Sequence, residues 1–289
     1  MAILSFGEIL WDVYGNDKKI GGAPLNVSAH LGKLGNKVYL ISSIGDDELG
    51  ILTKNELTRL GLDTRYIHTT NGYGTGRADV TLSGGIPTYS FPTPSAWDVI
   101  KLGKAEVDEI KRTRYDAFYY GTLSSRGNVS RSTLYNLFEI VDANLFFFDV
   151  NLRLNYYDKE IITKGLERAD ILKLNDEEYE VLVDLLGIKE GMVEILSRFD
   201  IRAILLTKGK EGASYITKDK VISKKAGKVK PVDTVGAGDS VSAAMIHFLT
   251  HGMDEEFALE KALALADFVV TEKGAVPDYP EWLSKALGI

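Results

Sequence analysis

Short runs of β-branched and aromatic residues alternate with longer stretches that have the period of a helix, and this alternation allows few architectures. It is typical of a mostly parallel sheet covered by helices on both faces, in the α/β class. The runs expected to form buried strands are Ile3–Ile9, Val38–Ile44, Ala117–Gly121, Leu145–Val150, Ile171–Leu174 and Ala203–Thr207. The expected helices are Pro24–Leu34, Asp47–Leu60, Ser130–Val141, Glu160–Arg168, Asp176–Leu185, Glu190–Arg198, Asp239–His251 and Asp254–Thr271.

Two stretches interrupt the alternation. Residues 11–20 are extended in pattern, and residues 74–98 contain a two-strand hairpin pattern with a turn at Gly84-Gly85. No linker rich in proline, glycine and serine separates them from the rest of the chain. We therefore predict one domain over residues 1–289, with a small β-sheet lid formed by these two segments. Such a sheet would cover a ligand or join two chains as a homodimer, and a surface hairpin without a role is the alternative.

Composition excludes several classes of function. The chain has 34 basic and 41 acidic residues and a net charge of -7, so it lacks the positive field that binds nucleic acid. It has no cysteine, which excludes disulfides, thiolate nucleophiles and cysteine-ligated zinc. The N-terminus does not have the pattern of a signal peptide, and no run approaches the roughly 18 apolar residues that cross a bilayer. We expect a cytoplasmic protein without nucleic-acid or membrane partners.

Several catalytic motifs are missing from the sequence. It contains no Walker-type phosphate loop, no G-x-G-x-x-G after the first predicted strand, no G-x-S-x-G elbow and no H-E-x-x-H. His247 and His251 have the spacing that lets two imidazoles bind one metal ion on a helix. No acidic residue lies between them and Gly252 follows, so the end of a helix is the better interpretation.

The most informative segment covers residues 232–249, VDTVGAGDSVSAAMIHFL. Gly236, Ala237 and Gly238 place three small residues before a helical run, where backbone N–H groups at the positive end of the helix dipole lack partners. Such a site binds anions and can stabilise a phosphoryl group during transfer. Asp239, at its mouth, could accept the proton of a hydroxyl that attacks phosphorus. The alternative is that Asp239 only caps the helix.

A second glycine-rich segment predicts a site for a polyol. Gly21 and Gly22 allow a ligand to approach the backbone closely, and Pro24 can begin a helix. Asn26 would then offer a donor and an acceptor from the first turn. Asp12, taken as the end of the first strand, would point into the same crevice if ligands bind at the carboxyl ends of the strands.

Together, GGAPLN at residues 21–26 and DTVGAGD at residues 233–239 resemble the paired signatures of the ribokinase-like, PfkB-type carbohydrate kinases. The resemblance covers essentially the whole chain. It implies a ribokinase-like fold and transfer of the γ-phosphoryl group of ATP to a hydroxymethyl hydroxyl of a small sugar. It also implies that Asp239 is the base and that residues 236–239 form the anion hole.

Smaller features of the family fall between the two signatures. Asn175 and Glu178 resemble its Asn-x-x-Glu element, which implies Mg²⁺ held through water molecules, and a helix cap is the alternative. The resemblance implies nucleotide contacts from Asn175, Thr207, Lys208, Gly209, Gly212, Gly236, Gly238 and Gly274. It further implies a monovalent cation, K⁺, at Asp233 and the backbone of Val235.

Within the family the chain most resembles fructokinases, because it carries three motifs typical of them. These are GEILWD at residues 7–12, GGAPLN at residues 21–26 and DVNLR at residues 149–153. D-fructose is therefore the expected acceptor. The implied sugar ligands are Asp12, Gly21, Gly22, Asn26, Arg153 and Asp239. The alternatives are a 2-keto-3-deoxygluconate kinase, a ribokinase or a nucleoside kinase, and, in another class, a regulator that binds sugar or nucleotide without turnover.

Overall fold

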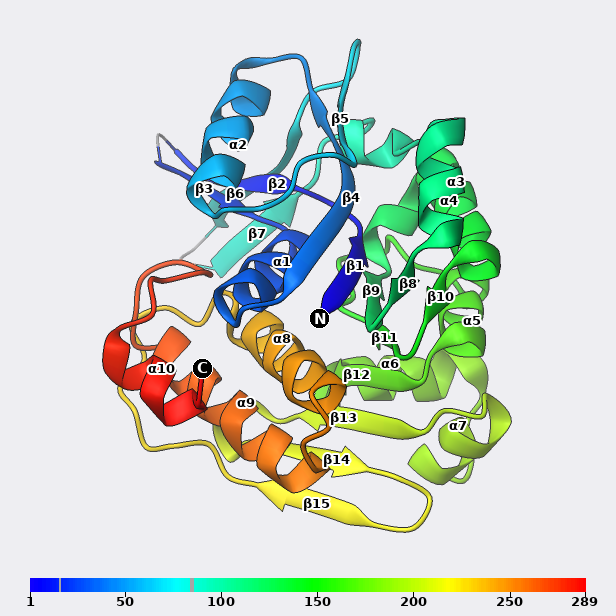
Figure 1. Cartoon of the computed structure of the whole chain (residues 1–289), viewed down its shortest axis with the longest axis vertical. Coiled ribbons are helices and arrows are strands. Elements are labelled where there is room, and N and C mark those ends of the chain that lie inside the picture. Colours follow the sequence, from blue (N-terminus) through cyan, green and yellow to red (C-terminus); the bar gives the residue numbers. More distant parts are fainter. Residues whose placement is uncertain (16, 84–85) are drawn as a thin grey trace.

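A large mostly parallel sheet forms the centre of the molecule (Figure 1). The structure is a computed structural model and describes residues 1–15, 17–83 and 86–289. Within these residues the sheet has nine strands in the order β15-β14-β13-β12-β11-β9-β1-β4-β5, and only β14 and β15 run antiparallel to their neighbours. The strands are β1 (Ala2–Phe6), β4 (Lys37–Gly45), β5 (Ile67–Thr70), β9 (Ala117–Gly121), β11 (Phe146–Asp149), β12 (Ile171–Asn175), β13 (Ala203–Thr207), β14 (Ala213–Ile216) and β15 (Val221–Lys224). The predicted α/β class is confirmed.

Helices cover both faces of this sheet, as predicted, because successive residues of its central strands point to opposite sides. Leu4, Phe118 and Tyr120 belong to the core on one side, while Ile3 and Tyr119 belong to the core on the other. The first core is covered by α3 (Lys104–Arg112), α4 (Asn128–Ile140), α5 (Lys159–Arg168), α6 (Asp176–Leu186) and α7 (Met192–Arg198). The second is covered by α1 (Ala23–Lys33), α8 (Ala237–Thr250), α9 (Glu255–Val269) and α10 (Glu281–Leu287).

The first strand is shorter than predicted, and this changes the location of Asp12. β1 ends at Phe6 rather than Ile9, since the chain turns at Gly7, where a Cβ atom would lie 2.4 Å from Pro24 Cγ. After this turn the chain leaves the main sheet and forms β2 (Leu10–Tyr14). The prediction that Asp12 ends the first strand is therefore wrong, because it lies within a strand of the smaller sheet.

The smaller sheet has four strands in the order β3-β2-β6-β7, in the region predicted as the lid. Its strands besides β2 are β3 (Asp17–Gly21), β6 (Gly76–Ser83) and β7 (Ile86–Ser90). The predicted Gly84-Gly85 turn lies outside the described residues. Beyond β7, the short helix η1 (Ala96–Val99) buries Trp97 completely in the main core.

The remaining elements connect these layers. They are α2 (Glu48–Arg59), the short helices η2 (Leu123–Arg126) and η3 (Gly209–Glu211), and the strand pair β8 (Arg114–Tyr115) and β10 (Asp142–Ala143). Among the described residues, no helix has both the length and the apolar character needed to span a membrane.

Candidate active site

A cavity of about 800 Å³ lies at the carboxyl ends of the central strands, beside the smaller sheet. Its lining includes fourteen residues predicted to form a site: Asp12, Gly22, Asn26, Arg153, Asn175, Glu178, Thr207, Gly209, Gly212, Val235, Gly236, Ala237, Gly238 and Asp239. Four predicted residues do not line the cavity: Gly21, Lys208, Asp233 and Gly274. The first three are adjacent in sequence to lining residues, and the Gly274 N–H is bound to Asp233. A second hollow, of about 540 Å³, is lined by none of the predicted residues.

The predicted anion site is the N-terminus of α8. Gly236 caps this helix with a φ of 82°, in the left-handed region that favours glycine. A Cβ atom on Gly236 would lie 2.5 Å from the carbonyl oxygen of Ala275, so a larger residue would displace the loop. The first N–H groups of the helix have no partner within it and lie at the positive end of its dipole. Ala237 and Gly238, at this end of the helix, line the cavity, and the Ala237 N–H also donates to the Thr234 carbonyl oxygen at 3.4 Å.

Asp239 does not cap the helix, because Gly236 is the N-cap residue and no side chain accepts a capping hydrogen bond. Asn26 Nδ2, in the first turn of α1, donates a hydrogen bond of 2.8 Å to Asp239 Oδ2. Burial is the largest influence on this carboxyl group and raises its pKa above that of an ordinary aspartate. The side chain still reaches the cavity. The geometry therefore provides an oriented carboxylate with one oxygen available as a proton acceptor.

The smaller sheet contributes the opposite wall. Asp12 on β2 lines the cavity, and burial raises the pKa of its carboxyl group. Gly22, which precedes α1, has a φ of 104°, and a Cβ atom there would lie 2.5 Å from the carbonyl oxygen of Glu8. Arg153 reaches the same cavity from the loop after β11. These residues therefore line the same cavity as the Asp239 carboxylate.

Glu8 is a site residue that the sequence analysis did not single out. It is buried and lines the cavity with Asp12 and Asn26. Burial raises the pKa of Glu8 to about 7, although the charge of Arg153 lowers it. Its position just after the first strand, within GEILWD, could have identified it as a site residue. At neutral pH this acid lies close to its midpoint of protonation.

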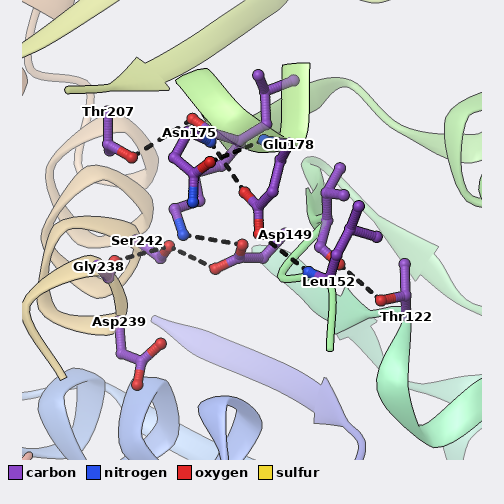
Figure 2. A network of polar contacts seen from close by, with 12 residues as sticks. Thr122, Asp149, Leu152, Asn175, Glu178, Thr207, Gly238, Asp239 and Ser242 are labelled. Atoms are coloured by element: carbon purple, nitrogen blue, oxygen red, sulfur yellow. Dashed lines mark hydrogen bonds and ion pairs between the residues drawn. The ribbon is translucent and has the colours of Figure 1, made fainter. Parts of the chain in front are cut away.

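Asn175 and Glu178 form a capping box at the start of α6. Asn175 Oδ1 accepts from the Glu178 N–H at 2.8 Å, and Glu178 Oε2 accepts from the Asn175 N–H at 2.9 Å. Glu178 Oε1 also accepts from the Leu152 N–H at 2.9 Å (Figure 2). The capping alternative thus describes the local geometry, and both side chains nevertheless line the cavity.

Asp149 lies at the centre of a buried polar network behind the anion site (Figure 2). Its Oδ1 accepts from Lys173 Nζ at 2.9 Å, and its Oδ2 accepts from Tyr119 Oη at 3.2 Å. Ser242 Oγ, on α8, lies 3.1 Å from Asp149 Oδ2 and 3.2 Å from the carbonyl oxygen of Gly238. The network therefore connects the ends of β11 and β12 to the first turns of α8.

Asp233 is bound by the loops on either side of it. Burial raises the pKa of its carboxyl group, but the N–H groups of Val235 and Gly274, at 3.1 Å each, bring it below the ordinary value. Lys19 Nζ, from β3 of the smaller sheet, lies 3.3 Å from Asp233 Oδ2. An ion pair thus joins this loop to the smaller sheet.

His247 and His251, at the end of α8, both make contacts within the fold. His247 Nδ1 lies 3.0 Å from Asn36 Nδ2, and His251 Nδ1 lies 2.7 Å from the carbonyl oxygen of His247. In the described part of the chain, no group of three or more acidic or histidine side chains is arranged to hold a metal ion.

Comparisons with known proteins agree with this geometry. The family model described as pfkB family carbohydrate kinase matches residues 4–282. The probable fructokinase-5 of Arabidopsis thaliana is 32% identical, over 96% of this chain and 94% of the relative. An uncharacterised sugar kinase from Pyrococcus horikoshii in complex with ATP is 27% identical, with a TM-score of 0.77 over 95% of this chain and 94% of that one.

The fold alone is also shared with the ATP-bound fructokinase of Xylella fastidiosa, at 22% identity and a TM-score of 0.86, over 99% of this chain and 97% of that one. The family model covers both glycine-rich signatures, and the structure brings both to one cavity. The chain therefore belongs to the pfkB family of carbohydrate kinases and is a phosphotransferase with an alcohol group as acceptor.

Proposed function

We propose that the protein is an ATP-dependent fructokinase that phosphorylates a hydroxymethyl hydroxyl of D-fructose. The observation that carries the proposal is the pair of Asn26 and Asp239, joined at 2.8 Å beside the N-terminus of α8 in a single cavity. The similarity to the probable fructokinase of Arabidopsis supports the acceptor, and the ATP complex of the Pyrococcus relative supports the donor. We also propose that the reaction takes place in the cytoplasm, the compartment expected from the sequence.

In the proposed reaction, Asp239 accepts the proton of the sugar hydroxyl as the hydroxyl oxygen attacks the γ-phosphorus. A new P–O bond forms, the bond between the γ-phosphorus and the bridging oxygen breaks, and ADP leaves with the electron pair of that bond. The N–H groups of residues 236–238 stabilise the negative charge on the phosphoryl oxygens. Asn26 occupies one oxygen of Asp239 and so orients the other toward the hydroxyl.

The proposed sugar ligands lie on the wall next to the smaller sheet. Asp12 and Asn26 would bind neighbouring hydroxyls, Arg153 would donate from the opposite loop, and Gly21 and Gly22 would let the sugar approach the backbone. Closing this wall over the sugar would exclude water from the phosphoryl group.

The proposed nucleotide site occupies the other half of the cavity. The turn from Thr207 to Gly212, which includes Lys208 and Gly209, borders it. At Gly212 a Cβ atom would lie 2.0 Å from the carbonyl oxygen of Lys224, so the shape of this turn requires glycine. Apolar residues that the sequence analysis did not identify line this part and suit an adenine ring, namely Val229, Leu263, Ala266 and Val270. Gly274 follows in the loop after α9.

We propose that Mg²⁺ binds through its water molecules at Glu178 and Asn175. The two Glu178 carboxylate oxygens suit a hydrated metal ion. Each accepts one backbone N–H group and can accept a further hydrogen bond from a metal-bound water molecule. Bound Mg²⁺ would neutralise phosphate charge. Glu178→Gln is expected to raise the magnesium concentration needed for half-maximal turnover several-fold, since a neutral amide attracts the hydrated ion less. An unchanged magnesium dependence would leave Glu178 as a cap alone.

We also propose a monovalent cation near Asp233. The Asp233 oxygens already bind two N–H groups and Lys19, so backbone carbonyls such as that of Val235 would supply most of the ligands. K⁺ should then increase turnover relative to tetramethylammonium. Equal rates in potassium, sodium and tetramethylammonium buffers would exclude this site.

We propose a homodimer formed through the smaller sheet. Its order leaves β3 and β7 at the edges, and an open edge strand can pair with another chain. Sedimentation should then report twice the 31.8 kDa mass of one chain. A single monomeric species at micromolar concentration would contradict the dimer.

The proposed function is tested by measuring ADP release with fructose, ribose, 2-keto-3-deoxygluconate, tagatose and adenosine. The highest kcat/KM is expected with fructose. If ribose or 2-keto-3-deoxygluconate is equal or better, the fructokinase assignment is wrong while the kinase assignment holds. Sugar binding without ADP release from any acceptor would instead favour the regulator.

Asp12→Ala is expected to lower kcat/KM for fructose about ten- to a hundred-fold, because an unsatisfied polar partner costs roughly 1–3 kcal/mol. The KM for ATP should change little. Asp17→Ala is the matched control, since it removes a carboxylate from β3 of the same sheet and Asp17 does not line the cavity. If Asp12→Ala instead raises the KM for ATP and leaves kcat/KM for fructose unchanged, Asp12 belongs to the nucleotide site and not to the sugar site.

A further inference from the structure

Lys173 is a buried lysine that the reaction described so far does not use. It lies on β12, is 6% exposed and lines the cavity. Its Nζ is 3.3 Å from the position that a Cβ atom on Gly238 would take. The ammonium group therefore faces the first turn of α8, where the phosphoryl group would bind.

Lys173 is paired with a buried carboxylate. Its Nζ forms a salt bridge with Asp149 Oδ1, and both side chains are buried. An ammonium group has three N–H donors. Among the described residues, Asp149 is its one hydrogen-bond partner, at 2.9 Å. Two donors are thus left for a ligand in the cavity.

The acidic lining of the cavity would repel a bound triphosphate unless a positive charge lay near the first turn of α8. Glu8, Asp12, Glu178 and Asp239 all line it, and a triphosphate would add several negative charges. The base itself would repel the phosphoryl group that it must approach. Of the basic residues in the lining, Arg153, Lys173 and Lys210, only Lys173 is buried.

The buried network holds the lysine and the anion site in one arrangement. Asp149 is completely buried and fixes Lys173 through Oδ1, while its Oδ2 contacts Ser242 on α8. Ser242 Oγ also lies 3.2 Å from the Gly238 carbonyl oxygen (Figure 2). A cation fixed in advance stabilises developing charge without reorganisation during the reaction.

We propose that Lys173 is a catalytic residue whose ammonium group contacts the oxygens of the phosphoryl group during transfer. The proposal rests on the proposed function. Lys173 forms no covalent bond and keeps its proton, while the proton of the attacking hydroxyl goes to Asp239. Its charge offsets the repulsion between the Asp239 carboxylate and the phosphoryl oxygens, as cations do in other phosphoryl transfers.

The test compares Lys173→Met with the double variant Lys173→Met/Asp149→Asn. The single change leaves Asp149 buried without its cation and could disturb the fold, whereas the double change removes both charges and keeps similar volumes. A catalytic role predicts that kcat falls about 10²- to 10³-fold in both variants, with the KM for fructose changed less than three-fold. Lys111→Met, on the surface helix α3, controls for removal of one positive charge.

The turnover of the double variant distinguishes catalysis from packing. If Lys173 only balances Asp149, the double variant should recover more than a third of wild-type turnover, and this result would overturn the proposal. The pH profile checks the electrostatic part of the argument: loss of the ammonium should move the acid limb of kcat/KM to higher pH in Lys173→Met in either case, because Lys173 lowers the pKa of Asp239. An unmoved acid limb would also count against it. Failure of the wild type to release ADP with any sugar would instead refute the proposed function.

Discussion

Replacing Asp239 by asparagine should lower turnover by on the order of 10²–10⁴-fold, because the variant keeps the side-chain volume but loses the proton acceptor. The hydrogen bond with Asn26 can reform with the amide, so the fold and the nucleotide site should persist. Steady-state kcat and KM, thermal unfolding and ADP affinity check each part. Retention of more than a third of wild-type turnover would remove Asp239 from the role of base.

The same variant should also change the pH dependence of the reaction. The carboxyl pKa of Asp239 is raised, and only the deprotonated form can accept a proton. In the wild type kcat/KM should therefore fall as the pH drops through this raised pKa. In Asp239→Asn this limb should disappear from the residual activity.

Gly236→Ala should have an effect of similar size through the backbone. The new methyl group would lie 2.5 Å from the Ala275 carbonyl oxygen and 2.6 Å from Ala275 Cα. The loop must therefore move, and its N–H groups would no longer be positioned to bind the phosphoryl oxygens. Losing one such donor commonly costs about 10²–10³-fold in kcat. Turnover should fall by at least this factor.

Gly252→Ala is the matched control for this prediction. Gly252 has a φ of 78°, close to the 82° of Gly236, but nothing lies within 4 Å of a Cβ atom there. The control carries the backbone strain of an alanine in the left-handed region, roughly 1–2 kcal/mol, without the collision. It should unfold more easily and keep its kcat. Equal kcat losses in the two variants would attribute the effect to strain rather than to the anion site.

The interior of the main sheet was predictable, because its strands are continuous apolar runs such as Ala117–Gly121 and Ala203–Thr207, which coincide with β9 and β13. Two of the missed elements have weaker patterns. α3 reads KAEVDEIKR and buries only Ile110, and β15 reads VISK with no buried residue. Such elements cover edges or surfaces, where few apolar residues are required.

The site was predictable where backbone shape determines it and less so where distant side chains meet. The glycines around Gly236 and Gly22 are needed locally, so they appear in the sequence as motifs. Lys173 gives no such signal, because its environment arises when β12 packs beside β11 and the start of α8. Asp12 was placed in the right cavity on the wrong strand, since the turn at Gly7 depends on the position of Pro24.

The bond between Asn26 and Asp239 joins residues separated by 213 positions, and this separation has a consequence for biosynthesis. During translation the N-terminal part of a chain leaves the ribosome first and can begin to fold. Asn26 therefore leaves the ribosome early, while Asp239 and α8 follow only after every strand of the main sheet has been synthesised. A ribosome-bound or prematurely terminated chain could hold much of the sheet and still consume no ATP. The bond between Asn26 and Asp239 can form only after the strands of both sheets have been synthesised.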